Sequence, residues 1–262
     1  MAILLTNDDG IDAPGLAILA EALAGLDDLH VSAPAENKSG VGMGITISRP
    51  LRATRHPDGR FGEKRYAVDG TPADAAKFGI QHILAEAPPR LVVSGINIGV
   101  NMGLNVRCSG TIGAAFEAAA AGVPALAVSI QYMEKEIWDG AMFYARKLAE
   151  MLLALPPGGD AFVLNLNVPS RMRGDIPGLV MARHGACGFR DYLRVEGDIV
   201  QPVGEWMSAE PGGDCDTAAF EAGYAVITPL RFEMTHENAM ARLGEAWKGE
   251  VSHWNPMGKN RS

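Results

Sequence analysis

Met1-Ala-Ile-Leu-Leu-Thr-Asn-Asp-Asp-Gly10 opens the chain and decides its fold class. Residues 3–5 form an unbroken apolar run, which is typical of a strand buried on both faces of a parallel sheet. The run leads into two adjacent carboxylates, Asp8 and Asp9. Because ligands of open α/β sheets bind at the carboxyl ends of the strands, we expect this pair to lie where the chemistry takes place.

The two carboxylates would repel each other unless positive charge lies between them. A divalent cation, which prefers hard oxygen ligands, would remove that repulsion. The alternative is that Asp8 and Asp9 are loop residues and that one of them caps the next helix. An isolated Asp-Asp-Gly favours this alternative, so the metal hypothesis depends on the loops that follow.

Length and composition bound the class of protein. The 262 residues, 47% hydrophobic and 21% charged, suit a single domain spanning 1–262 with a large core. A net charge of −8 without a basic tract argues against DNA or RNA as a bulk partner. Cys108, Cys187 and Cys215 lack Cys-x-x-Cys spacing, so neither a disulfide framework nor a zinc site is expected. With no leader-like start and no long apolar segment, we expect a cytoplasmic protein with no membrane partner.

Strand-like apolar runs alternate with segments of helical spacing up to about residue 169, which predicts βαβ units and a parallel sheet. The expected strands are 3–5, 30–33, 90–94, 125–130 and 161–167. The expected helices are 16–26, 72–84, 112–121 and 137–155. Thr71 is the expected N-cap of the second helix. Residues 51–55 and 64–68, separated by His56-Pro-Asp-Gly-Arg60, predict an antiparallel hairpin outside this alternation.

Beyond residue 169 the alternation stops, and we expect the main sheet to end there. Short strand-like runs lie at 179–183, 192–195, 199–203 and 224–230. They predict a β-rich extension over about 170–262 that is used in oligomerisation. Asp214 and Asp216 invite a metal interpretation, but their position in a turn favours a solvated loop. Residues 235–247 have helical spacing.

Two further loops leave the carboxyl ends of predicted strands. Residues 34–44 carry Asn37 and Ser39, which offer neutral oxygens, beside glycines that let the backbone approach a ligand closely. Residues 95–105 contain Asn97, whose carbonyl oxygen is a ligand type that hard cations accept beside carboxylates. Taken alone, residues 34–44 would be interpreted as a plain flexible loop.

Ser109-Gly110-Thr111 precedes an Ala-rich helix and predicts a phosphate-binding segment. The first helical turn is small and apolar, so its N–H groups and the two neighbouring hydroxyls are open to an anion. The segment is neither a Walker loop, which needs Gly-Lys-Ser/Thr, nor part of a dinucleotide fingerprint, because the preceding glycines are spaced four residues apart. Alone, such a helix start is more often a packing feature.

Together these segments resemble the SurE family of stationary-phase survival proteins, over essentially the whole chain. The matching stretches are Ile3–Gly10, Ala13–Gly15, Pro34–Gly40, Gly70–Pro72, Val93–Asn97, Gly99, Asn101, Ser109–Thr111, Gly122–Ser129, Leu166–Pro169 and Asp216–Leu230. The resemblance implies a Rossmann-like three-layer α/β core and a C-terminal extension that forms homodimers or homotetramers. Two departures bear on base preference and substrate fit: Cys108 replaces the family's usual tyrosine, and Val41–Gly44 is less polar than expected.

The resemblance also implies a function, that of a 5'/3'-nucleotidase whose substrates are nucleoside monophosphates. Its metal ligands fall on Asp8, Asp9, Ser39 and Asn97, which would hold one Mg²⁺ or Mn²⁺ per subunit. Its phosphate-holding segment falls on Ser109, Gly110 and Thr111, and Asn97 and Asn101 are further candidates for substrate contact. Asp8 or Asp9 would orient or deprotonate the attacking water.

Three alternatives to this function stay open. A phosphatase with a covalent aspartyl nucleophile, as in the haloacid dehalogenase superfamily, needs Asp-x-Asp, whereas these carboxylates are adjacent. A non-catalytic nucleotide-binding regulator would use the same phosphate segment without turnover. Hydrolysis of short polyphosphate chains is an activity that the same site would support.

Overall fold

The computed structural model describes residues 1–57, 64–156, 162–210, 212–247 and 250. The chain divides into two compact units, Met1–Leu230 and Arg231–Ser262. In the part of the chain that the structure describes, no helix is both long enough and apolar enough to cross a membrane.

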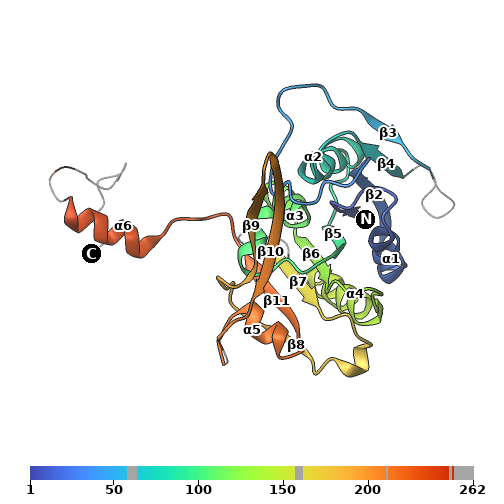
Figure 1. The fold of residues 1–262 in the computed structure, drawn as a ribbon. Coiled ribbons are helices and arrows are strands. Elements are labelled where there is room, and N and C mark those ends of the chain that lie inside the picture. The colour runs from blue at the N-terminus through green and yellow to red at the C-terminus, as the bar shows by residue number, and fades with distance from the viewer. Residues whose placement is uncertain (58–63, 157–161, 211, 248–249, 251–262) are drawn as a thin grey trace. The chain divides into compact units, whose positions relative to one another are not determined.

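Nine strands form the main sheet, in the order β3-β4-β2-β1-β5-β6-β7-β11-β8 (Figure 1). Their bounds are β1 Ala2–Thr6, β2 Asp28–Pro34, β3 Ala53–Arg55, β4 Arg65–Val68, β5 Leu91–Ile98, β6 Ala125–Ile130, β7 Val163–Val168, β8 Leu179–Met181 and β11 Ala225–Leu230. β1 lies between β2 and β5 and is parallel to both, and parallel pairing continues through β6 to β7. The expected α/β class with a parallel core is confirmed.

Helices cover both faces of the sheet and so produce three layers (Figure 1). The helices are α1 Pro14–Leu23, α2 Pro72–Phe78, α3 Gly110–Ala120 and α4 Asp139–Leu153. In β1, Ile3 and Leu5 pack with α1 and α4 in one core cluster, whereas Leu4 packs with α3 in the other. Burial on both faces explains why the first strand is apolar without alternation.

α2 begins at the predicted cap. The Thr71 hydroxyl accepts the N–H of Asp74 at 3.1 Å, and the Asp74 carboxylate accepts the N–H of Thr71 at 2.9 Å. This reciprocal pair satisfies two N–H groups that a helix start would otherwise leave without a partner. The helix passes into a π-helical turn, Gly79–Ile83, so the predicted segment 72–84 is not one uniform α-helix.

The predicted hairpin at 51–68 forms, but it belongs to the main sheet. β3 pairs antiparallel with β4, and β4 pairs parallel with β2, so the two strands extend one edge. Residues 58–60 of the expected turn lie outside the described residues.

The expectation that the main sheet ends near residue 169 is wrong. β11 pairs antiparallel with β7, and β8 pairs parallel with β11, so two strands of the predicted extension complete the sheet. β11 is almost wholly buried. The apolar pattern of residues 225–230 predicts that the strand is buried. It does not identify the strand that β11 pairs with, which lies far away in the chain.

The remaining described part of the extension contains a separate antiparallel pair, β9 Gly188–Glu196 and β10 Ile199–Met207, and a short helix, α5 Asp216–Glu221. The second unit contains α6 Glu237–Ala246, which lies within the predicted helical segment. The role of the extension in oligomerisation stays a prediction.

Candidate active site

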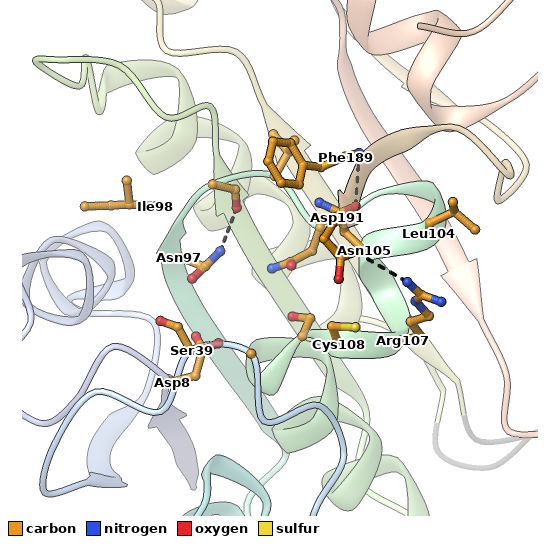
Figure 2. Close-up of a pocket in the computed structure, with 15 residues that line it drawn as sticks. Asp8, Ser39, Asn97, Ile98, Leu104, Asn105, Arg107, Cys108, Phe189 and Asp191 are labelled. Atoms are coloured by element: carbon orange, nitrogen blue, oxygen red, sulfur yellow. Dashed lines mark hydrogen bonds and ion pairs between the residues drawn. The ribbon is translucent and has the colours of Figure 1, made fainter. Parts of the chain in front are cut away.

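A cavity of about 400 Å³ opens where β1, β2 and β5 reach their carboxyl ends (Figure 2). The predicted site residues that line it are Asp8, Ser39, Asn97, Asn101 and Ser109. The far wall comes from the 3₁₀ helix Gly103–Cys108 and from the start of β9. Three separate loops thus place their polar residues in one cavity, as expected for the carboxyl edge of a parallel sheet.

Asp8 is held tightly at the inner side of this cavity. Its side chain is 3% exposed, and the Thr111 hydroxyl donates to Asp8 Oδ1 at 2.6 Å. Burial raises the pKa of Asp8, and the hydrogen bonds from Thr111 and from the backbone amides of Gly110 and Thr111 offset only part of that rise. Gly110 and Thr111 of the predicted phosphate-binding segment therefore donate hydrogen bonds to the Asp8 carboxylate.

Gly110 permits this close approach. A Cβ at position 110 would lie 2.8 Å from Asp8 Cβ, which is closer than real side chains come. Ser109 caps the same helix, because its hydroxyl accepts the N–H of Ile112 at 3.1 Å. The start of α3, predicted to be open to an anion, thus already carries a carboxylate and a hydroxyl at its N–H groups.

Asp9 lies beside Asp8 and is only partly buried. Its pKa rises to about 6, first because of burial and second because of the neighbouring charge of Asp8. The amide of Asn37 donates to Asp9 Oδ1 at 3.4 Å. The repulsion inferred from the sequence is therefore present in the fold, at a site where a cation would relieve it.

The donor set fits a hard cation. Asn97 donates through Nδ2 to the carbonyl of Gly99 at 2.6 Å, which leaves its amide oxygen facing Asp8 and Ser39 (Figure 2). Among the described residues, no group of three or more His, Cys, Asp or Glu side chains could hold a metal. Two carboxylates with neutral oxygens are instead the ligand type of Mg²⁺ or Mn²⁺, which retain several waters.

Asn101 lines the cavity but is engaged with the neighbouring strands. Its side chain donates to the Ser129 hydroxyl at 2.9 Å, and its backbone N–H donates to Asn167 Oδ1 at 2.7 Å. Its carbonyl accepts from Asn165 at 2.7 Å. These bonds attach the loop after β5 to β6 and β7, so the contacts of Asn101 in the structure are those of an anchor.

Sequence reasoning missed the far wall of the cavity. Arg107, the only basic residue among the described residues that line it, pairs with Asp191 of β9 at an Nη2–Oδ1 distance of 3.5 Å. Phe189 of β9 donates its N–H to Asn105 Oδ1 at 3.1 Å. No local pattern joins residues 105–107 to 189–191, which meet only in the folded chain.

Asp216 is not the solvated turn residue that the sequence predicts. It is 0% exposed, and its carboxylate accepts the N–H groups of Gly103 at 3.1 Å and Gly185 at 3.0 Å. His184 Nε2 lies 2.8 Å from the Gly103 carbonyl. The sequence places Asp216 in a turn before a helix, and such a position is usually exposed. In the structure the extension packs on the 3₁₀ helix, and the Asp216 carboxylate is buried because its oxygens accept backbone N–H groups from both.

The fold and the cavity define a three-layer α/β protein with an oxygen-rich ligand site at the carboxyl edge of its parallel sheet. A family model described as "Survival protein SurE" matches residues 3–191. The chain belongs to the SurE family, which confirms the resemblance.

Relatives over nearly the full length carry one description. "5'-nucleotidase SurE" of Desulforamulus reducens is 39% identical over 253 residues, covering 93% of this chain and 97% of the relative. "5'-nucleotidase SurE 1" of Burkholderia lata is 37% identical over 250 residues, covering 92% and 94%. The crystal structure of the SurE protein from Aquifex aeolicus aligns with a TM-score of 0.81 at 31% identity, covering 94% of this chain and 99% of that one. The expected enzyme class, a phosphoric monoester hydrolase, agrees with the names of these relatives.

Proposed function

We propose that this chain is a metal-dependent phosphomonoesterase that hydrolyses nucleoside 5'-monophosphates, and 3'-monophosphates as well. The observation that carries the proposal is that the buried Asp8 shares one cavity with the oxygens of Ser39 and Asn97, while the partly buried Asp9 follows Asp8 directly in the chain. The 5'-nucleotidase names of the curated relatives support the same reaction.

The four oxygen-bearing residues would hold one Mg²⁺ or Mn²⁺. When bound, that ion neutralises the phosphoryl oxygens and lowers the pKa of water. Asp8, fixed by Thr111, keeps its carboxylate in place. Asp9 is the more exposed carboxylate, so it is the one that orients the attacking water and receives its proton.

The far wall holds the phosphate. Among the described residues the Arg107 guanidinium pairs with the exposed Asp191 through one nitrogen, Nη2, so further N–H donors can face non-bridging oxygens. Ser109 lines the same cavity. Catalysis then consists of positioning and charge stabilisation, which account for most of phosphoryl transfer.

The test is phosphate release from a panel of nucleoside 5'- and 3'-monophosphates with Mn²⁺, Mg²⁺ or EDTA. We expect metal-dependent release from the native chain, its loss in Asp8→Asn and Asn97→Ala, and native rates in Asp175→Asn, which makes the same chemical change at an exposed residue outside the cavity. Titration calorimetry of Mn²⁺ against the same variants reports binding separately from turnover. Nucleotide binding without phosphate release from any monophosphate would refute the hydrolase proposal.

We also propose that the chain forms a homodimer or homotetramer through the β9–β10 pair. Apolar side chains that include Leu193, Val195 and Ile199 are exposed on it. Burial of such surface is the usual driving force for association. Light scattering coupled to size-exclusion chromatography measures the oligomeric state, and a monomer at micromolar concentration would contradict this proposal.

A further inference from the structure

A second cavity, of about 540 Å³, adjoins the first. The residues that line both cavities are Gly99, Val100, Asn105 and Phe189. The two cavities therefore lie next to each other, on either side of these four residues. The second cavity is also lined by Tyr132, Trp206 and Phe220, which come from three different segments of the fold.

Two of these aromatic rings form a pair on the hairpin. Phe189 of β9 and Trp206 of β10 are direct partners in the antiparallel register, so their side chains project from the same face. They are partly exposed, at 43% and 39% of their surface. Their free surface is thus available to a ligand in the cavity.

Contacts within the protein fix both rings before any ligand arrives. The Trp206 indole N–H donates to Glu221 Oε1 at 2.6 Å, and Glu221 Oε2 accepts the N–H of Ala209 at 3.2 Å. The Phe189 ring packs directly against Gly204 of β10, since a Cβ on Gly204 would fall 2.1 Å from its Cε1. A preorganised aromatic surface binds a planar ligand without the cost of ordering its own side chains.

We infer that Phe189 and Trp206 form a base-binding subsite for the nucleoside part of the substrate. The inference rests on the proposed function, which places the phosphate in the first cavity. A nucleoside monophosphate carries a phosphate at one end of a ribose and a planar ring at the other, which matches an anion cavity joined to an aromatic one. Stacking contributes about 1–3 kcal/mol per base and tolerates every base, because each has a π-face.

The subsite gives the enzyme a preference that phosphate chemistry alone does not. Ribose 5-phosphate carries the same scissile bond as a nucleoside 5'-monophosphate but lacks the ring that would contact Phe189 and Trp206. Short polyphosphates lack it too. The native chain should therefore prefer nucleotides to both and discriminate only weakly among bases.

The experiment compares kcat/KM for adenosine 5'-monophosphate and ribose 5-phosphate in the native chain and in Phe189→Ala, Trp206→Ala and Trp206→Phe. We expect each alanine variant to lose about tenfold or more on the nucleotide. Trp206 lines only the second cavity, so Trp206→Ala should keep the native rate on ribose 5-phosphate, and Trp206→Phe should restore most of the loss. Tyr192→Ala is the matched control, because Tyr192 is an exposed aromatic residue of β9 that lines neither cavity. It should leave both rates unchanged.

Equal losses on both substrates in Trp206→Ala, or no loss on the nucleotide in either alanine variant, would overturn the subsite while leaving the hydrolase intact. If the native chain releases phosphate from no nucleoside monophosphate of the panel, the proposed function fails, and the subsite is judged by calorimetry with adenosine alone. Adenosine binding that Trp206→Ala weakens supports the subsite, and binding that is absent or unaffected by this substitution refutes it.

Discussion

Thr111 and Asp8 lie 103 residues apart in the chain, yet the Thr111 hydroxyl donates to Asp8 Oδ1 at 2.6 Å and both side chains are buried. The bond joins the first turn of α3 to the loop after β1. It satisfies a carboxylate that burial has removed from water, and it makes the position of a predicted metal ligand depend on a distant helix.

Thr111→Val removes this donor and keeps the side-chain volume. A buried hydrogen bond to a charged group contributes about 1.5–3 kcal/mol, so we expect the free energy of unfolding to fall by that amount. We also expect kcat/KM for nucleoside monophosphates to fall by about tenfold or more, since each 1.36 kcal/mol lost from the transition state costs tenfold. Urea unfolding and phosphate release measure the two effects. Thr111→Ser keeps the hydroxyl and should remain near native, and a fully active valine variant would show that the bond does not position Asp8.

Gly110→Ala should separate activity from stability. Alanine is favoured over glycine in helices, but the new Cβ would meet Asp8 Cβ at 2.8 Å. Asp8 must move, so we expect metal affinity and phosphate release to fall sharply while circular dichroism still reports a folded chain. Gly174→Ala is the control, because no atom of the described residues lies within 4 Å of a Cβ at that position. Native metal affinity in Gly110→Ala would contradict the close packing of Asp8 on α3.

Asp216→Asn tests the buried carboxylate that joins the extension to the 3₁₀ helix. The substitution replaces an acceptor by an N–H₂ group, which must face backbone donors from Gly103 or Gly185. We expect a loss of about 2–3 kcal/mol in unfolding free energy. Asp214→Asn makes the same change two positions away, where the side chain is 79% exposed, and should stay within about 0.5 kcal/mol. Equal effects of the two substitutions in urea unfolding would rule out the anchoring role.

Asp74 should make the start of α2 sensitive to acid. Burial raises the pKa of its carboxyl, but the hydrogen bonds from Thr46 and Thr71 outweigh that effect, so the pKa in the folded state lies below the ordinary value. A carboxyl with a lowered folded pKa stabilises the fold above its unfolded pKa, and this contribution disappears as the pH falls through the folded pKa.

We therefore expect Asp74→Asn to be less stable than the native chain at neutral pH by about 1–2 kcal/mol. The difference should shrink as the pH falls below about 4, the ordinary pKa of an unfolded aspartate, and should disappear once the pH has passed the lower folded pKa. Urea unfolding of both chains across this range measures it. A difference that is constant with pH would mean that the ionised form of Asp74 has no special role.

The positions of Asp8 and Asn97 at one edge of the sheet were predictable, because they depend on the sequence pattern close to each residue. Asp8 and Asn97 each lie at the end of an apolar run, and the parallel sheet that such runs predict brings their loops to one edge. The cap at Thr71 depends only on its neighbours and was predictable for the same reason.

The contacts that hold these residues were not predictable. Asp216 reaches Gly103 across 113 residues, and Phe189 reaches Asn105 across 84. Periodicity indicates that a residue is buried but not which residue lies against it. The sequence around Asp216 and Phe189 therefore did not indicate that these residues contribute to the walls of the cavity.

The place of β11 has a consequence for how this protein is made. A ribosome delivers the chain from its N-terminus, so β7 emerges long before residues 225–230 that pair with it. Until then β7 presents an unpaired edge next to an assembled parallel sheet, and such edges recruit strands from other chains. A chain that stops near residue 169 lacks β11 and would keep this edge of the sheet unpaired.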